Sequence, residues 1–280
     1  MKTLIALAAL VTVVGCSKAP PQQKPDPVGD KSVALLGDGT RTSFAAILEE
    51  AGITARCVDD SSVAARAKLL ASADLVLVVV DSTEGPMTIH REDILLARQF
   101  AAGPVAVAFS RTDLVDDPEL LELEELEMRE LLAMYELDGD NAPVFFDSPR
   151  ARTPMPQGAA PVRAVLEGLR PAPERDAADP WTRLSVSIYV LADEETYDRG
   201  VARPLPDGSC TAVFAGGSVS AMIQPEAAIP PGESGEGILV CSSPIGVASG
   251  ERFVLSENGH VTAAGSVIGR QRVKVDQTEP

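Results

Sequence analysis

The segment that most constrains the fold of this chain is the run at residues 75–80, with the sequence LVLVVV. Six consecutive apolar residues that end at Asp81 are typical of a strand buried on both faces of a parallel sheet. Parallel strands are joined by crossover connections, which are usually helices. The run therefore predicts an α/β domain built from βαβ units.

Strand-like and helix-like segments alternate on both sides of this run, as βαβ units require. The first predicted helix places Phe44, Ile47 and Leu48 on one side, which indicates that this side faces the core. The predicted strands are 33–36, 75–80, 105–109 and 143–146, and the predicted helices are 43–50, 89–100 and 118–135.

The helix predicted over 118–135 is strongly acidic, and a segment such as ELLELEELEMREL can also be an interaction motif. Its apolar residues fall almost entirely on one half of a helical wheel, which favours a core-facing stripe opposite a solvated acidic face. Only Leu126 falls outside that half. The expected core-facing residues are Leu120, Leu121, Leu123, Met128, Leu131, Leu132, Met134 and Tyr135.

The second half of the chain has a different pattern. Residues 171–181 are rich in proline and charge and predict a linker between an α/β domain at 31–170 and a second domain at 182–272, before a tail at 273–280. Short strands separated by turn residues predict a small antiparallel barrel or sandwich. These strands are expected at 184–191, 211–214, 218–223, 237–241, 252–256 and 260–268.

The N-terminus carries a short apolar run from Leu4 to Gly15. As a helix it would rise about 18 Å, which is short of the roughly 30 Å of a bilayer core. Residues 1–15 therefore indicate a signal peptide. Residues 16–30 are proline-rich without apolar periodicity and predict an extended tether.

Residues 13–16 (VVGC) resemble a bacterial lipobox. The resemblance implies cleavage before Cys16, diacylation of its thiol and stable anchoring in a membrane, because two or three acyl chains hold a protein where one does not. Ser17 at the next position resembles the sorting class of the outer membrane, so the expected location is the bacterial cell envelope. The alternative is an ordinary secretory signal in which Cys16 stands by chance.

Charge and composition argue against nucleic-acid partners. The chain has 24 Lys and Arg against 41 Asp and Glu, a formal net charge of −17, and contains no basic run. Such a balance repels phosphate backbones. Aromatic residues make up 4% of the chain and supply little surface for base stacking.

Residues 84–87 (EGPM), 91–99 (REDILLARQ) and 112–117 (TDLVDD) resemble the GTP-binding domain of elongation factor Tu, and the similarity runs from Asp74 to Ser148. It implies a P-loop-GTPase-like α/β domain with a mostly parallel sheet. Residues 186–195 and 263–268 resemble the C-terminal barrel of the same family. The family's middle barrel has no counterpart here, which argues against a role in translation.

The phosphate-binding loop of this family would correspond to Gly37-Asp38-Gly39-Thr40-Arg41-Thr42. In GxxxxGK[ST] loops, backbone N–H groups and a Lys hold the phosphates and a hydroxyl ligates Mg²⁺. Here the loop is about three residues shorter, Thr40 stands at the Lys position and Arg41 at the hydroxyl position. The phosphate site is therefore expected to be lost. One alternative is a rewired site in which Arg41 replaces the Lys, and another is a plain strand-to-helix turn.

The other nucleotide motifs are partly retained. Ser110-Arg111-Thr112-Asp113 matches the family's Asn-Lys-x-Asp motif only at Asp113, whose carboxylate would read guanine, and Ser148 matches the serine of the last guanine loop. The Asp-x-x-Gly segment expected at 58–63 lacks its glycine and its histidine. The two histidines, His90 and His260, do not match that catalytic position.

Further sequence features do not indicate catalysis. No metal-ligand spacing or catalytic triad is present, and four cysteines are too few for a disulfide scaffold. Cys210 and Cys241 fall in predicted barrel strands, and the sequence leaves open whether they form a disulfide or stay free. The expectation is a membrane-anchored, non-catalytic pseudo-GTPase that needs no cofactor and binds an envelope protein. The alternatives are a GTPase that uses GTP and Mg²⁺, and an envelope-exposed ligand binder.

Overall fold

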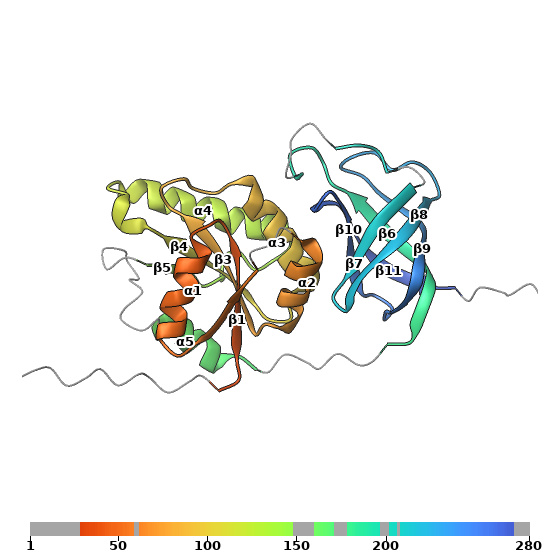
Figure 1. The fold of residues 1–280 in the computed structure, drawn as a ribbon. Helices are drawn as coiled ribbons and strands as arrows, with labels where there is room; N and C mark the ends of the chain where they lie inside the picture. The colour runs from red at the N-terminus through yellow and green to blue at the C-terminus, as the bar shows by residue number, and fades with distance from the viewer. Residues whose placement is uncertain are drawn as a thin grey trace, which may run out of the picture.

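The computed structural model describes residues 29–58, 62–147, 160–170, 178–196, 202–205 and 208–271, which form two domains side by side (Figure 1). Cys16, the signal segment 1–15, Ser148 and the predicted tail 273–280 lie outside the described residues. The predicted fold class is confirmed: a P-loop-GTPase-like α/β domain is followed by an antiparallel barrel.

The first domain has a five-stranded sheet in the order β2-β1-β3-β4-β5, and every strand pair in it is parallel. Residues of α2, α3 and α4 pack on one face, and those of α1 and α5 on the other. The strands are β1 (Ser32–Gly37), β2 (Thr54–Cys57), β3 (Leu75–Asp81), β4 (Val105–Ser110) and β5 (Val144–Phe146). The helices are α1 (Arg41–Glu50), α2 (Val63–Ser72), α3 (Thr88–Phe100), α4 (Pro118–Met134) and α5 (Ala160–Gly168), with a 3-10 turn, η1, at Thr112–Leu114.

Strand β3 confirms the prediction from its apolar run, because all of its residues are buried. Val76, Val78 and Val80 face the side of α2 and α3, whereas Leu77 and Val79 face the side of α1 and α5. The strand with the longest apolar run is thus covered on both faces, and it is the central strand of the sheet.

The stripe predicted on α4 was partly wrong. Met128, Leu131, Leu132 and Tyr135 are buried, but Leu120, Leu123 and Met134 are exposed, and Glu124 lies in the buried stripe instead. The buried positions follow the i, i+4, i+7, i+8 spacing, so the packed arc is narrower than the half-wheel assumed from sequence. Ile47 on α1 is likewise exposed, while Phe44 and Leu48 are buried.

The second domain is a closed antiparallel barrel in the order β10-β11-β6-β9-β8-β7, with a buried apolar interior. This confirms the barrel of the two predicted alternatives. Its strands are β6 (Pro180–Val190), β7 (Gly208–Phe214), β8 (Gly217–Pro225), β9 (Ser234–Gly246), β10 (Arg252–Glu257) and β11 (His260–Arg270), so that β6 begins within the predicted linker.

The two domains share one hydrophobic cluster. Helices α2 and α3 pack against β7, β8, β10 and β11 of the barrel. Leu191, Val213, Val254, Val261 and Ala264 of the barrel domain belong to the same buried cluster as the apolar faces of those helices. The interface is therefore built like a core, and it fixes the barrel against one face of the α/β domain (Figure 1).

Candidate functional site

The candidate site lies at the carboxyl ends of β1, β3, β4 and β5, where open α/β sheets bind ligands. The turn after β1 begins at Gly37, whose φ is +106°. A Cβ at this position would overlap the backbone carbonyl of Val79 on β3. Only glycine fits, so the turn lies tightly against the neighbouring strand.

The Asp38 side chain places a carboxylate inside this turn. Its Oδ1 accepts hydrogen bonds from Thr40 N at 2.8 Å and Thr40 Oγ1 at 2.5 Å, and its Oδ2 accepts from Asp81 N at 2.6 Å. Burial raises the pKa of Asp38, but hydrogen bonds from His90, Thr40 and the Asp81 amide outweigh it and lower that pKa overall. The Asp38 carboxylate thus binds donors that a phosphate would use.

Arg41 does not point away from the loop to receive a phosphate. Its guanidinium donates to the carbonyl oxygens of Gly37 at 2.9 Å, Asp38 at 2.7 Å and Val58 at 3.2 Å. These bonds tie the strand-to-helix turn to the end of the segment after β2. Of the other predicted loop residues, Gly39 and Thr42 are exposed.

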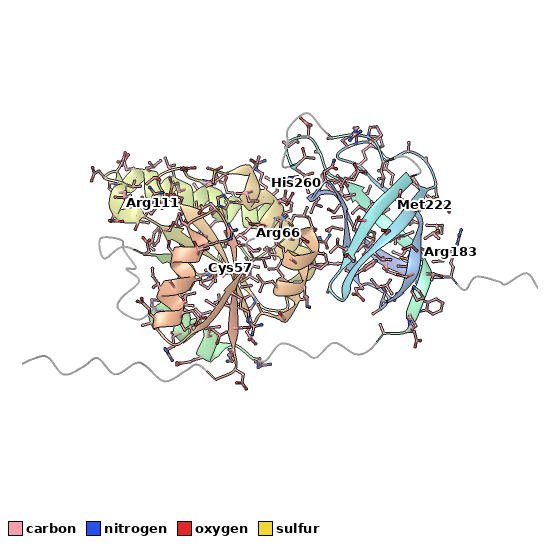
Figure 2. All side chains as sticks on the ribbon, in the orientation of Figure 1. Cys57, Arg66, Arg111, Arg183, Met222 and His260 are labelled. Carbon is pink, nitrogen blue, oxygen red and sulfur yellow. The ribbon has the colours of Figure 1, made fainter. Side chains whose placement is uncertain are left out.

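The loop after β4 is also held by the protein itself. Ser110 Oγ donates to Thr40 Oγ1 at 2.7 Å, which links the two loops. Arg111 has a left-handed φ of +59° and donates from Nη1 to Asp81 Oδ2 at 2.6 Å. The side chain at the Lys position of the Asn-Lys-x-Asp motif therefore reaches Asp81 on β3. Figure 2 labels Arg111 on the α/β domain.

Asp147, at the end of β5, holds the remainder of this loop. It accepts from the backbone N of Arg111 at 2.7 Å and from Thr112 N at 3.2 Å. Asp113, the predicted guanine reader, is exposed on η1 beside these residues. The structure thus brings Thr40, Arg111 and Asp113 to one edge of the sheet, while Ser148 lies outside the described residues.

The residues present do not fit a bound β-phosphate with Mg²⁺. The Gly37 amide donates to Asp93 Oδ2 at 2.7 Å, and the Thr40 amide is taken by Asp38. The hydroxyl of Thr40, the residue predicted to stand at the Lys position of the phosphate-binding loop, is also engaged with Asp38. No group of three or more His, Cys, Asp or Glu suited to a metal ion occurs within the described part of the chain.

Several buried polar side chains could not be predicted from the sequence. His90 is fully buried on α3, where its Nδ1 accepts from Met87 N at 2.8 Å and its Nε2 lies 3.1 Å from the Val79 carbonyl and 3.6 Å from Asp38 Oδ2. Arg66 on α2 pairs with Glu92 and Asp93 on α3. The sequence signal for such a pair is a charged residue on an otherwise apolar helix face. The spacing of residues along the chain does not show which charged residues pair with each other.

Glu124 is a second unforeseen buried acid. It is 6% exposed, and its Oε2 has no hydrogen-bond partner among the residues that the structure describes. Burial, together with the charges of Glu127 and Asp81, raises the pKa of Glu124 to about 7. The acid lies beneath the turn at Gly85, next to the strand ends that form the candidate site.

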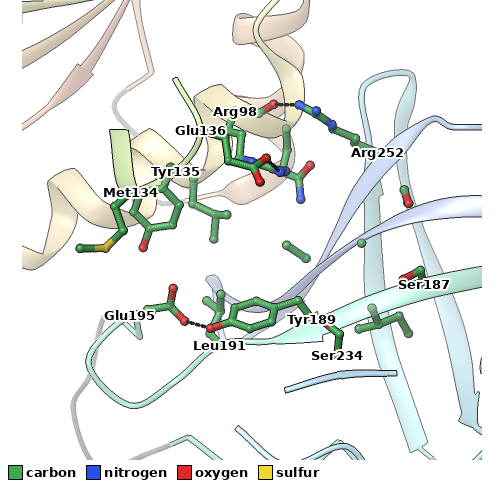
Figure 3. A pocket seen from close by; sticks show the side chains of 16 residues that line it. Arg98, Met134, Tyr135, Glu136, Ser187, Tyr189, Leu191, Glu195, Ser234 and Arg252 are labelled. Carbon is green, nitrogen blue, oxygen red and sulfur yellow. Dashed lines mark hydrogen bonds and ion pairs between the residues drawn. The ribbon is translucent and has the colours of Figure 1, made fainter. Parts of the chain in front are cut away.

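A pocket of about 500 Å³ lies between the two domains (Figure 3). Its polar side chains include Arg98, whose carbonyl accepts from Arg252 Nη1 at 2.5 Å, and Tyr189, whose hydroxyl donates to Glu195 at 2.7 Å. Gln99 also lines it, and its buried Oε1 lacks a partner within the described ranges. The apolar part of the wall is formed by Leu95, Met134, Ile188 and Leu191.

Two of the cysteines lie on strands of the barrel. Cys210 on β7 and Cys241 on β9 both pair in register with Ala221 on the strand between them, and both are free thiols. The possible disulfide is therefore not formed.

None of the described helices is long and apolar enough to cross a bilayer.

Residues 62–167 match the family model of the elongation factor Tu GTP binding domain. The matched stretch runs from the start of α2 to the end of α5 and includes Arg111, Asp113 and Glu124. This part of the chain is thus a translational-GTPase-like domain, as the resemblance predicted. Gly37 to Thr42 precede the matched stretch.

Proposed function

We propose that the chain is a non-catalytic pseudo-GTPase that serves as a binding or scaffold module. The observation that carries the proposal is the Asp38 carboxylate, which accepts the Thr40 and Asp81 amide hydrogens inside the turn. A phosphate there would face this carboxylate, and two like charges about 4 Å apart repel by about 4 kcal/mol near a protein surface. Nucleotide binding would also have to break the Asp38 and Arg41 hydrogen bonds.

Titration with a fluorescent GTP analogue and Mg²⁺ tests this proposal on residues 30–280. We expect no saturable change in fluorescence at micromolar concentrations, and no release of phosphate from GTP. As a matched comparison, Asp38→Gly removes the internal carboxylate and should bring at most weak binding, because the Lys is still missing. Tight Mg²⁺-dependent binding by the unaltered sequence would overturn the proposal.

The second candidate is a GTP-binding protein with residual GTPase activity. The observation that favours it is the grouping of Asp113, Arg111 and Asp147 at the strand ends, which leaves the Asp113 carboxylate exposed and able to accept from a base. It requires Arg41 to leave its three carbonyl partners and take the place of the Lys. Loss of any measured GTP binding in Asp113→Ala, but not in Asp116→Ala, would support this candidate.

The proposal also includes a lipid anchor at Cys16 in a bacterial envelope, on the outer membrane. It is supported by the resemblance of residues 13–16 to a lipobox and by the tether predicted at 16–30. Metabolic labelling with a fatty acid should mark the full-length chain and not Cys16→Ser. Equal labelling of both chains would exclude Cys16 as the acylated residue.

As the binding surface of such a module, we favour the interdomain pocket, because polar side chains such as Tyr189 and Glu195 and apolar ones such as Leu95 and Ile188 line it together. A small ligand with an apolar body and a hydrogen-bonding group would match this mixed lining. Thermal-shift screening of amide-bearing fragments tests this use. Stabilisation should disappear in Ser234→Trp, which places an indole at the exposed pocket rim, and should persist in Ser220→Trp on the outer face of β8.

A further inference from the structure

A second pocket, also of about 500 Å³, lies where the start of α2 meets β7, β8 and the turn between β10 and β11. Helix α2 contacts β7 and β8, and Figure 1 shows it beside the barrel. None of the described residues that line this pocket belongs to the wall of the pocket in Figure 3. Its volume is within the range of small-molecule sites, which is roughly 300–1,000 Å³.

The turn between β10 and β11 holds one polar side chain at this pocket. Asn258 and Gly259 form the two-residue loop of the hairpin, and their φ angles of +52° and +86° are both left-handed. An Asn-Gly pair is the sequence that such a loop favours. The Asn258 amide, which can both donate and accept, is therefore placed at the pocket by a well-defined turn.

Three hydroxyl groups on neighbouring barrel strands line the same pocket. They belong to Thr211 on β7, Ser218 on β8 and Ser256 on β10, and Ser256 pairs in register with Thr211. Ser256 is only 8% exposed. Within the described part of the chain, none of these hydroxyls and no atom of the Asn258 side chain has a hydrogen-bond partner. Four polar side chains thus meet at one pocket with their hydrogen-bonding capacity unused.

The rest of the described lining is largely apolar. Val63 of α2 and Val213 of β7 belong to the hydrophobic cluster that joins the domains, and Ala64 packs against it. A ligand in this pocket would therefore meet hydroxyl and amide groups on one side and methyl groups on another.

The pocket has no charged wall. Among the residues that the structure describes, no ionisable side chain lines it. At the start of α2, Ser62 Oγ already accepts from Ala65 N at 3.3 Å, so this helix end has part of its own cap. Glu257, which precedes the turn, is exposed and would repel an anion. An uncharged ligand is thus the best match.

We propose that this pocket binds a small neutral ligand with several hydroxyl groups, of the size of a mono- or disaccharide. The ligand hydroxyls donate to and accept from Ser256, Thr211 and Asn258, while its C–H groups contact Val63 and Val213. This site goes beyond the proposed function, since neither the nucleotide turn nor the pocket of Figure 3 takes part in it.

NMR titration of the whole chain with glucose and trehalose tests the site, with glucose 6-phosphate as the charged comparison. At least one neutral sugar should shift the backbone amide signals of Asn258 and Gly259 saturably. Glucose 6-phosphate should not do so at the same concentrations. The proposal is overturned if neither neutral sugar shifts these signals, if glucose 6-phosphate shifts them as strongly, or if the shifts occur at Tyr189 and Ser234 instead.

Variants at the pocket separate binding there from binding elsewhere. Ser256→Ala removes one hydroxyl and should weaken binding by about fivefold, as expected for one neutral hydrogen bond. Ser218→Trp places an indole at the exposed rim and should abolish binding. Ser220→Ala and Ser220→Trp, two residues along β8 and outside the pocket, should bind like the unaltered chain. Unchanged affinity in Ser218→Trp, folded by circular dichroism, would also overturn the proposal.

Discussion

At the scale of single residues, the polar side chains of the candidate site form hydrogen bonds with other groups of the protein. Asp38, Arg41 and Asp147 each bind backbone groups of the loops that surround them. In a nucleotide site these groups would be available for phosphate or base. These internal contacts support the proposal that the loops keep their shape without a nucleotide.

Replacement of Asp38 by Asn should destabilise the protein. The Asn side chain loses the charge that the Thr40 and Asp81 donors stabilise, and the expected loss is about 1–3 kcal/mol of unfolding free energy. Urea denaturation at pH 7 measures it, with the exposed Asp113→Asn as a control that should change little. Because the folded pKa of Asp38 is lowered, its contribution is present at neutral pH and disappears as the pH falls through that pKa.

Glu124 should make stability fall with rising pH. Its pKa is about 7 in the folded protein against an ordinary value of 4.5, so the folded state binds the proton more tightly. Stability therefore decreases between about pH 4.5 and 7 and becomes level above 7. Glu124→Gln should remove this slope and raise the melting temperature at pH 8. Glu130→Gln, at an exposed position of the same helix, should keep the slope.

At the scale of elements, α4 gives a direct test of which leucines stabilise the fold. Leu132 is fully buried, whereas Leu123 is 62% exposed on the same helix. Leu132→Ala should cost about 2–5 kcal/mol of unfolding free energy, and Leu123→Ala should leave it within about 0.5 kcal/mol. Chemical denaturation compares the two, and a large loss in Leu123→Ala would show that the exposed face is packed in solution.

The same elements show what sequence could and could not predict. The run at β3 predicted its own burial and the parallel sheet, because a strand covered on both faces leaves a continuous apolar pattern. The barrel strands followed from alternation and turns. The position of Glu124 depended on how α4 rotates against its neighbours, and the pairing of Arg66 with Asp93 joins residues far apart in the chain. Neither is encoded in local spacing.

At the scale of the whole molecule, the shared hydrophobic cluster predicts that both domains unfold together. Val213 of the barrel and Leu70 of α2 belong to one buried group, so neither domain can open without exposing the other's apolar surface. Differential scanning calorimetry should show one transition for residues 30–280. Val213→Ser should separate it into two, whereas the exposed Met222→Ser should leave a single transition.

The architecture also limits what the molecule can do. The α/β domain keeps the parallel sheet of a translational-GTPase-like domain, and its barrel-facing helices are fixed by apolar packing and by the buried charges at Arg66. Together with the internally hydrogen-bonded turn after β1, this packing supports the proposal of a binding module without a nucleotide cycle.

Isothermal titration calorimetry of GTP and GDP into residues 30–280, with Mg²⁺ in excess, tests the central claim most directly. If Asp38 and Arg41 have closed the phosphate site, neither nucleotide should give saturable heat at micromolar concentrations. Micromolar Mg²⁺-dependent binding that Asp113→Ala abolishes would contradict the account and establish a working nucleotide site.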